Sequence, residues 1–303
     1  MIPDDKVTEI YFIIDEFFKE FDTVIREHSL ENPNTKKRNR KFTMSESEVM
    51  TILLLFHFGA FKNLKSFYVF YVQKHMQKDF PRAVSYNRFV ELQRKVCIPL
   101  AVFVKMMCLG KCTGISFIDS TPLRSCHIKR EKQHKTFKGI AEKGQCSIGW
   151  FYGFKLHLII NDKGEILDFI LTPGNVDDRE PLKSIDLHKR IFGKLFGDKG
   201  YISKDLFEQL FVDGVHLITK LRKNMKNALM LLQDRIMLRK RALIESVNDE
   251  LKNMCQIEHT RHRSFDNFVI NILSALAAYA FFPKKPSINT NTDIIDIEKW
   301  GAA

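Results

Sequence analysis

Apolar residues recur at helical spacing through the first third of the chain, from Val7 to about Pro99. The recurrence follows the three-to-four residue period that places side chains on one face of a helix. It involves Ile10, Ile13, Ile14, Phe17, Phe18 and Phe21, and later Val49, Ile52, Leu53 and Phe56. The pattern therefore predicts an all-α N-terminal domain over residues 1–110.

One helix in this region has a clear start signal. The segment Ser45-Glu-Ser-Glu48 stands before an apolar run and has the form of a capping box, so a helix is predicted from near Glu46 to Gly59. A second helix is predicted from about Leu64 after a short turn. The pair is compatible with a DNA-binding helix-turn-helix and equally with two neighbours in an ordinary helical bundle.

After Lys111 the pattern changes to short β-type runs separated by turns. The predicted strands cover residues 115–120, 153–160, 165–172, 194–197 and 215–221, and the turn at 161–164 joins the second and third as a hairpin. The predicted helices cover residues 178–192, 204–212, 228–254 and 268–282, the last apolar on all sides and therefore buried.

Three antiparallel strands followed by alternating helices and strands is the order of the ribonuclease H-like fold. The sequence thus predicts an α/β domain with a mixed five-stranded sheet and helices over residues 111–282. A polar tail with Pro, Asn and Thr, expected to be loosely ordered, covers residues 283–303.

Charge is sorted along the chain, which carries 48 Lys and Arg against 36 Asp and Glu, a net +12. The first 35 residues are acidic, whereas five cations occupy a six-residue loop, and a second basic stretch covers residues 220–241. The loop cations are Lys36, Lys37, Arg38, Arg40 and Lys41. Two separated basic segments indicate a polyanionic partner, most simply nucleic acid.

Other classes of protein are disfavoured by the composition. With 45% hydrophobic residues the chain is expected to fold, and the apolar run 268–282 is too short for a membrane span. The N-terminus lacks the order of a signal peptide, so a cytoplasmic, nucleoid-associated protein without a membrane partner is expected. The six cysteines are expected to be free thiols, because an intracellular chain of this size does not need disulfides. Cys108, Cys112, Cys126 and His127 form only a loosely spaced, weak zinc pattern.

Two aspartates end predicted strands. Asp119 closes the apolar run Phe117-Ile118, and Asp198 follows Leu195-Phe-Gly. Each alone could be a turn or cap residue. In the predicted topology, however, the first and fourth strands lie side by side, so the two carboxylates are expected to point to one place.

A third carboxylate is expected from the long C-terminal helix. Arg241, Glu245 and Lys252 fall within roughly 40° of one another around a helix at about 100° per residue. The same stripe could be an ordinary solvated face with an i, i+4 ion pair, and Asp249 and Glu250 are nearby alternatives. An acid flanked by cations suits the binding of a metal and a phosphate together.

Three converging carboxylates can hold two divalent cations about 4 Å apart for an in-line displacement at phosphorus. Ligands that are all oxygen favour Mg²⁺, with Mn²⁺ as a substitute. Asp119, Asp198 and Glu245 are therefore the predicted catalytic and metal-binding residues, with Arg241 and Lys252 contacting phosphates.

These residues resemble the signature of the DDE-type insertion-sequence transposases. That family has Asp on strand one, Asp after strand four, and Glu within Y-x2-R-x3-E-x6-K, which Asp119, Asp198, Arg241, Glu245 and Lys252 match. Leu238 stands at the Tyr position, a departure from the motif. The segments 259–264, 267–268 and 283–286 look most like insertion-sequence family 982, related to the insertion-sequence family 4 group.

The resemblance implies a bacterial DNA transposase whose N-terminal domain recognises terminal inverted repeats. Its catalytic domain would cleave double-stranded DNA and join strands to target DNA, as a homodimer on DNA. Two alternatives are a hydrolysis-only nuclease and a domesticated or decayed DNA-binding protein without catalysis.

Further residues are candidates for supporting roles. Arg261 and Arg263 follow the predicted catalytic helix and are expected to contact phosphates. Lys155 and His157 share a strand face that is either solvent-exposed or close to Asp119. Residues 177–178 are interpreted as a helix N-cap rather than as metal ligands.

Overall fold

The computed structural model describes residues 2–28, 43–59, 61–146, 149–185, 187–220, 230–258 and 262–288. Its contacts divide the chain into two compact units. Met1–Cys108 and Leu251–Phe282 form the first, called here the helical unit, and Leu109–Glu250 with Pro283–Ala303 form the second, the sheet unit. Within the described residues, no helix is both long enough and apolar enough to cross a bilayer.

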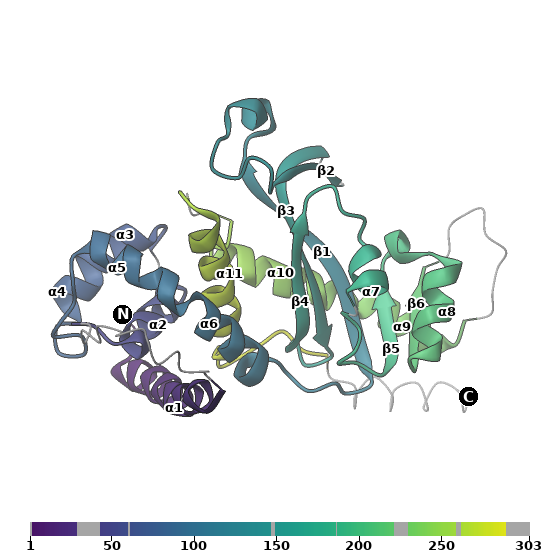
Figure 1. The fold of residues 1–303 in the computed structure, drawn as a ribbon. Coiled ribbons are helices and arrows are strands. Elements are labelled where there is room, and N and C mark those ends of the chain that lie inside the picture. Colours follow the sequence, from purple (N-terminus) through teal and green to yellow (C-terminus); the bar gives the residue numbers. More distant parts are fainter. Residues whose placement is uncertain are drawn as a thin grey trace. The chain divides into compact units, whose positions relative to one another are not determined.

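The described elements of the helical unit are helices and short helical turns (Figure 1). They are α1 (Asp4–His28), α2 (Glu46–Phe56), α3 (Leu64–Ser66), α4 (Gln73–His75), α5 (Tyr86–Gln93), α6 (Cys97–Phe103) and α11 (Phe265–Ala280), with π-helical segments at Phe67–Val72 and Val104–Cys108. The predicted capping box is confirmed, because Ser45 accepts from the Glu48 N–H and Glu48 accepts from the Ser45 N–H.

The predicted C-terminal apolar helix is also found, as α11, but it packs with the N-terminal helices. It contacts α2 and α6, and most of its residues are buried. The sequence interpretation placed residues 111–282 in one domain, whereas the contacts group α11 with residues from the start of the chain. An apolar helix must be buried somewhere, and periodicity does not say against which partner.

The sheet unit is built on a mixed sheet of six strands (Figure 1). Its order is β2-β3-β1-β5-β6, with β4 also pairing with β3. The strands are β1 (Ile115–Cys126), β2 (Glu142–Cys146), β3 (Gly149–Asn161), β4 (Ile166–Pro173), β5 (Gly193–Gly197) and β6 (Val215–Thr219). The α/β fold class is confirmed, and the expected five strands are corrected to six, since β2 had no clear hydrophobic alternation.

The directions and neighbours of the strands agree with the predicted order of three antiparallel strands, with the first and fourth strands side by side. β1, β3 and β4 pair antiparallel, whereas β1, β5 and β6 run parallel. β1 and β5, the predicted first and fourth strands, are neighbours, as expected.

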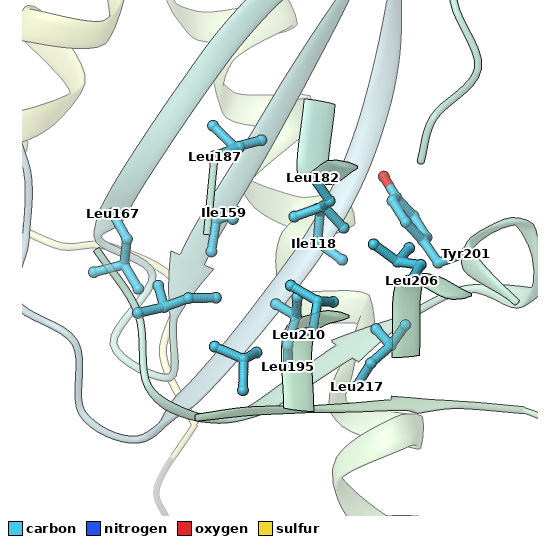
Figure 2. Close-up of a cluster of buried hydrophobic side chains, with 12 residues drawn as sticks. Ile118, Ile159, Leu167, Leu182, Leu187, Leu195, Tyr201, Leu206, Leu210 and Leu217 are labelled. Atoms are coloured by element: carbon cyan, nitrogen blue, oxygen red, sulfur yellow. The ribbon is translucent and has the colours of Figure 1, made fainter. Parts of the chain in front are cut away.

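Helices pack on both faces of this sheet. One face carries an apolar cluster in which Ile118 and Leu195 of the strands meet Leu182, Leu206, Leu210 and others (Figure 2). The cluster draws on α7 (Glu180–Ser184), α8 (Lys204–Val212) and the turns beside them. Because side chains alternate along a strand, Asp119 points to the opposite face from Ile118, where α10 (Ala242–Asp249) contacts β1.

Two predicted helices are shorter than expected. Among the described residues of the segment 178–192, the only helix is α7. Leu187 and Ile191 still reach the core, from the non-helical residues that follow Ser184. The segment 228–254 is divided into α9 (Leu232–Lys240), α10 and a π-helical segment (Glu250–Met254), with Arg241 between the two α-helices. Buried positions at helical intervals do not distinguish a continuous helix from one that is interrupted.

Candidate active site

Asp119 lies on β1 directly after two fully buried residues, Phe117 and Ile118. Its side chain is 23% exposed. Its backbone pairs with Leu158 of β3, so the carboxylate leaves the sheet in the middle of a strand pair. The sequence prediction placed it at the end of a strand, whereas β1 continues to Cys126.

Asp198 occupies the matching position on the neighbouring strand. Phe117 of β1 is in register with Phe196 of β5, so Asp119 and Asp198 each follow that pair by two residues. Asp198 caps the short 3₁₀ turn Lys199–Tyr201, and its Oδ1 accepts from the Gly200 N–H at 2.8 Å. Parallel pairing thus places the two aspartates on neighbouring strands at the same level of the sheet, close together as predicted.

Glu245 comes from α10, and Arg241 lies one turn before it. Arg241 Nη2 is 2.9 Å from Glu245 Oε1, and Arg241 Nη1 is 3.7 Å from Asp119 Oδ1. The guanidinium therefore bridges a carboxylate of the helix and a carboxylate of the sheet. The interruption of the long helix at Arg241 leaves the predicted i, i+4 relation intact.

The three acids act on one another electrostatically. Burial is the main cause that raises the pKa of Asp119 from its ordinary 3.8 to about 6. The Arg241 charge lowers this pKa, while the charges of Asp198 and Glu245 raise it. Asp119 is therefore a desolvated carboxyl whose neighbouring positive charge only partly offsets burial and like charge, a pattern that clusters at functional sites.

No three His, Cys, Asp or Glu side chains in the described residues lie close enough to hold one metal ion together. Two of the acids are engaged by protein donors instead, since Arg241 binds Glu245 and the Gly200 N–H binds Asp198. The donor set still suits a hard cation, because all three acids offer oxygen. Two buried oxygens in the same region, Asn248 Oδ1 and the Tyr201 hydroxyl, also have no hydrogen-bond partner.

Asn248 was not predicted as a site residue. Its Nδ2 donates to Asp119 Oδ2 at 3.3 Å from the α10 turn that follows Glu245. The spacing of Asn248 three residues after Glu245 was a usable signal, because residues three apart share a helix face.

A fourth carboxylate near the site was also missed. Asp178 Oδ1 accepts from Ser120 Oγ and from Lys155 Nζ, both at 2.9 Å. Ser120 follows Asp119 directly in β1. The sequence interpretation of residues 177–178 as a helix N-cap is wrong, because Arg179 is the N-cap of α7 and no side chain caps it. Asp177 instead binds the Arg179 guanidinium through both of its oxygens.

The face that carries Lys155 and His157 is not solvent-exposed. His157 is fully buried, and its Nε2 lies 2.9 Å from Thr172 Oγ1 of β4. Burial is the main cause that lowers the pKa of His157 to about 4. Lys155 is half-buried and reaches Asp178. Because His157 pairs with Ser120 and Lys155 with Pro122, this face is the one opposite the Asp119 carboxylate, so neither side chain lies at Asp119 as the sequence had allowed.

Other predicted residues lie elsewhere. Lys252 belongs to the helical unit, where its Nζ is 3.6 Å from Glu258 Oε2. Arg263 precedes α11 in the same unit. Outside the described residues lie Lys36, Lys37, Arg38, Arg40, Lys41 and Arg261, and also residues 221–229 of the second basic stretch.

The fold and the arrangement of these acids together define a class of protein. Acidic side chains from two adjacent parallel strands and a following helix, on one face of an α/β sheet, form a candidate centre for phosphodiester chemistry. The family described as "Transposase DDE domain" matches residues 109–265, just over half of the chain. The chain belongs to this family of DDE transposases, which are DNA-binding enzymes that cleave DNA and transfer its strands.

No curated protein matches the chain. Among solved structures, the chain is similar to the piggyBac transposase in its synaptic complex with hairpin DNA, at 12% sequence identity and a TM-score of 0.49. That match covers 91% of this chain and 72% of the other. DDE transposase domains generally use divalent metal ions.

Proposed function

We propose that this transposase serves a bacterial insertion sequence, most like insertion-sequence family 982, through a ribonuclease H-like catalytic domain. It would hydrolyse one phosphodiester at each terminal inverted repeat and use the freed 3′ hydroxyl to attack target DNA. The observation that carries the proposal is the coupling at Asp119. Its carboxyl is partly buried and lies 3.7 Å from the Arg241 guanidinium that also binds Glu245, and the charges of Asp198 and Glu245 raise its pKa.

In this proposal Asp119, Asp198 and Glu245 hold divalent cations, Mg²⁺ or in its place Mn²⁺, two in each site. When bound, such ions activate the attacking oxygen and stabilise the leaving oxygen of an in-line displacement. The oxygen donors and the partly unsatisfied surroundings of Asp119 support this assignment.

Arg241 would exchange partners during the reaction. Its guanidinium now bonds Glu245 and approaches Asp119. With Asp119 and Glu245 engaged in holding cations, the fork of Arg241 donors would be released to bind a phosphate, which suits guanidinium geometry. Lys252 is proposed as a second phosphate contact.

DNA recognition is assigned to the N-terminal helices and the basic segments. Helices α2 and α3 follow each other with a short connection, which supports a helix-turn-helix role for an all-α domain. The cations of residues 36–41, with Arg261 and Arg263, would contact the DNA backbone. Because joining two ends needs two active sites in one complex, we propose a homodimer on DNA.

The test is cleavage of DNA that spans the flanks of the native gene. Wild-type protein, Asp119→Asn and the control Asp205→Asn, an exposed acid in the first turn of α8, are incubated with Mg²⁺, Mn²⁺ or chelator. Ends are then mapped at nucleotide resolution.

We expect metal-dependent cuts at both flanking repeats with the wild type and with Asp205→Asn, and none with Asp119→Asn. The cut ends should then be joined to added target DNA. Cuts without joined products would indicate a hydrolysis-only nuclease. If Asp119→Asn cleaved as well as wild type, the assignment of the site would be wrong.

A further inference from the structure

Tyr201 is a buried tyrosine at the end of the short turn that Asp198 caps. Its side chain is 1% exposed, and its hydroxyl has no hydrogen-bond partner among the described residues. A buried polar group without a partner costs free energy, and native proteins contain few of them. Phenylalanine would pack as well at this position, so the hydroxyl indicates a role of its own.

The ring of Tyr201 belongs to the apolar cluster on the face of the sheet that carries α7 and α8. Gly197 makes room for the ring, because a Cβ there would stand 3.1 Å from Tyr201 Cδ2 and 3.3 Å from Ile118 Cγ2. Gly197 is the last residue of β5, so the ring lies against the end of that strand. The hydroxyl is directed away from Leu210 and Leu217 of the cluster (Figure 2).

The hydroxyl is close to the acids of the candidate active site. Burial is the main cause that raises the pKa of Tyr201 well above its ordinary 10, and the charges of Asp119, Asp178 and Asp198 raise it further. Coulomb interactions weaken with distance, so the acids that affect the hydroxyl are its neighbours. A phenol is protonated at neutral pH, and the hydroxyl is therefore a hydrogen-bond donor beside these carboxylates.

The three acids differ in the hydrogen bonds that they already accept. Asp178 Oδ1 accepts two side-chain bonds at 2.9 Å, and Asp198 Oδ1 accepts a backbone N–H at 2.8 Å. Asp119 has longer side-chain contacts, 3.3 Å from Asn248 Nδ2 and 3.7 Å from Arg241 Nη1. Of the three charges, that of Asp119 also has the largest effect on the pKa of the tyrosine. Asp119 is therefore the acid that a further donor would hold most effectively.

A carboxylate that binds a cation through one oxygen is oriented by the hydrogen bonds to its other atoms. These outer hydrogen bonds fix the ligand in place and contribute much of the metal affinity. In the proposed function Arg241 is released to a phosphate, so Asp119 loses its charged neighbour. The donors that are left for its carboxylate then include the long bond from Asn248 and the unpartnered hydroxyl of Tyr201.

We propose that Tyr201 is a positioning residue of the metal site, whose hydroxyl donates to the Asp119 carboxylate when that carboxylate holds a cation. The ring, fixed between the end of β5 and the apolar cluster, keeps the hydroxyl in place beforehand. The inference rests on the proposed function, since it needs Asp119 to be a metal ligand.

Binding of Mn²⁺ by the full chain tests the proposal without cleavage as a readout. Free Mn²⁺ is measured by electron paramagnetic resonance while the ion is titrated into the wild type and into Tyr201→Phe. The Kd for Mn²⁺ is expected to rise by roughly tenfold or more in Tyr201→Phe, the usual effect of removing an outer hydrogen bond from a metal ligand. Tyr152→Phe is the matched control, because its hydroxyl donates to the Phe137 carbonyl in the same unit, and it should bind Mn²⁺ like the wild type.

Unfolding in urea with chelator distinguishes positioning from a structural role. Tyr201→Phe keeps the ring and removes an unpartnered buried hydroxyl, so its unfolding midpoint should equal or exceed that of the wild type. In the cleavage assay, the Mn²⁺ concentration that gives half of the maximal rate should rise by a larger factor than the maximal rate falls. Unchanged Mn²⁺ affinity in Tyr201→Phe would overturn the proposal, whatever its unfolding midpoint.

The metal site and the role of Tyr201 can fail separately, because Asp119→Asn is titrated with Mn²⁺ in the same way. If Asp119→Asn weakens Mn²⁺ binding and Tyr201→Phe does not, the metal site stands and the role of Tyr201 is wrong. If Asp119→Asn binds Mn²⁺ as tightly as the wild type, the assignment of the metal site is wrong. A wild type that neither binds Mn²⁺ nor cleaves DNA would overturn both.

Discussion

Two titratable side chains, a buried one in the helical unit and a partly buried one in the sheet unit, have very different surroundings. His57 in the helical unit is fully buried, its Nδ1 donates to the Cys255 carbonyl at 2.6 Å, and its Nε2 lies 2.9 Å from Ser274 Oγ. Asp119 in the sheet unit has a long bond from Asn248 and an Arg241 charge at 3.7 Å, beside two other acids.

The difference distinguishes a polar group that is buried for stability from one that is buried for function. His57 has a partner on each ring nitrogen, and burial lowers its pKa to about 4, so it is neutral at pH 7 and joins α2 to the C-terminal part of the helical unit. Asp119 keeps an unfavourable balance of desolvation and like charge, which costs stability in the folded protein. Such a cost is expected where a ligand supplies the missing charge.

The largest expected effect is on catalysis by Asp119→Asn. Cleavage should fall by at least about a thousandfold, as for loss of a group that acts in the transition state. In chelator at pH 7 the free energy of unfolding should stay the same or rise, by up to about 2 kcal/mol, because a desolvated charge is removed. Urea unfolding and the cleavage assay measure both, and a clear loss of stability would contradict the contrast with His57.

His57→Ala is expected to lower stability and to leave catalysis nearly unchanged. Removing the ring leaves a cavity and two polar groups without their partner, and should lower the free energy of unfolding by about 3 kcal/mol. The cleavage rate of the protein that remains folded should be close to wild type. His75→Ala, an exposed histidine of the same unit, is the control and should change stability by less than about 0.5 kcal/mol.

The pH dependence of stability follows from the same residue. The pKa of His57 falls from 6.5 in the unfolded chain to about 4 in the folded protein, mainly through burial, with a smaller effect of the His262 charge. Between these values the unfolded state binds the proton and the folded state does not, so stability is lost as the pH falls from 6.5 towards 4.

The loss attributable to His57 is on the order of 3 kcal/mol for this shift. His57→Gln, which does not titrate, should therefore show a shallower decline of stability over the same pH range. Urea unfolding at several pH values measures the two slopes. Parallel curves for wild type and variant would mean that His57 does not titrate in this way.

The smallest expected effect concerns Ser120, which donates to Asp178 beside the site. Ser120→Ala should lower the free energy of unfolding by about 1 kcal/mol and reduce cleavage only modestly, because Lys155 still holds Asp178. Unfolding and cleavage are measured together. A loss of cleavage as large as that of Asp119→Asn would place Ser120 in the catalytic machinery and weaken the distinction between scaffold and site.

Local patterns in the sequence were enough to predict several elements of the structure. The Ser45 and Glu48 capping box, the apolar runs that precede Asp119 and Asp198, and the spacing of Arg241 and Glu245 all depend on residues that are close in the chain. Hydrophobic periodicity and capping are local, so they could be read from the sequence.

The tertiary structure decided what joins these elements. It pairs β1 with β5, groups α11 with the N-terminal helices, and interrupts the long helix at Arg241. It also brings Asp178 to Ser120, 58 positions away, and Asn248 to Asp119, 129 positions away. Contacts at such separations depend on how whole elements pack, and packing satisfies burial and hydrogen bonding over the whole fold rather than any pattern within one segment.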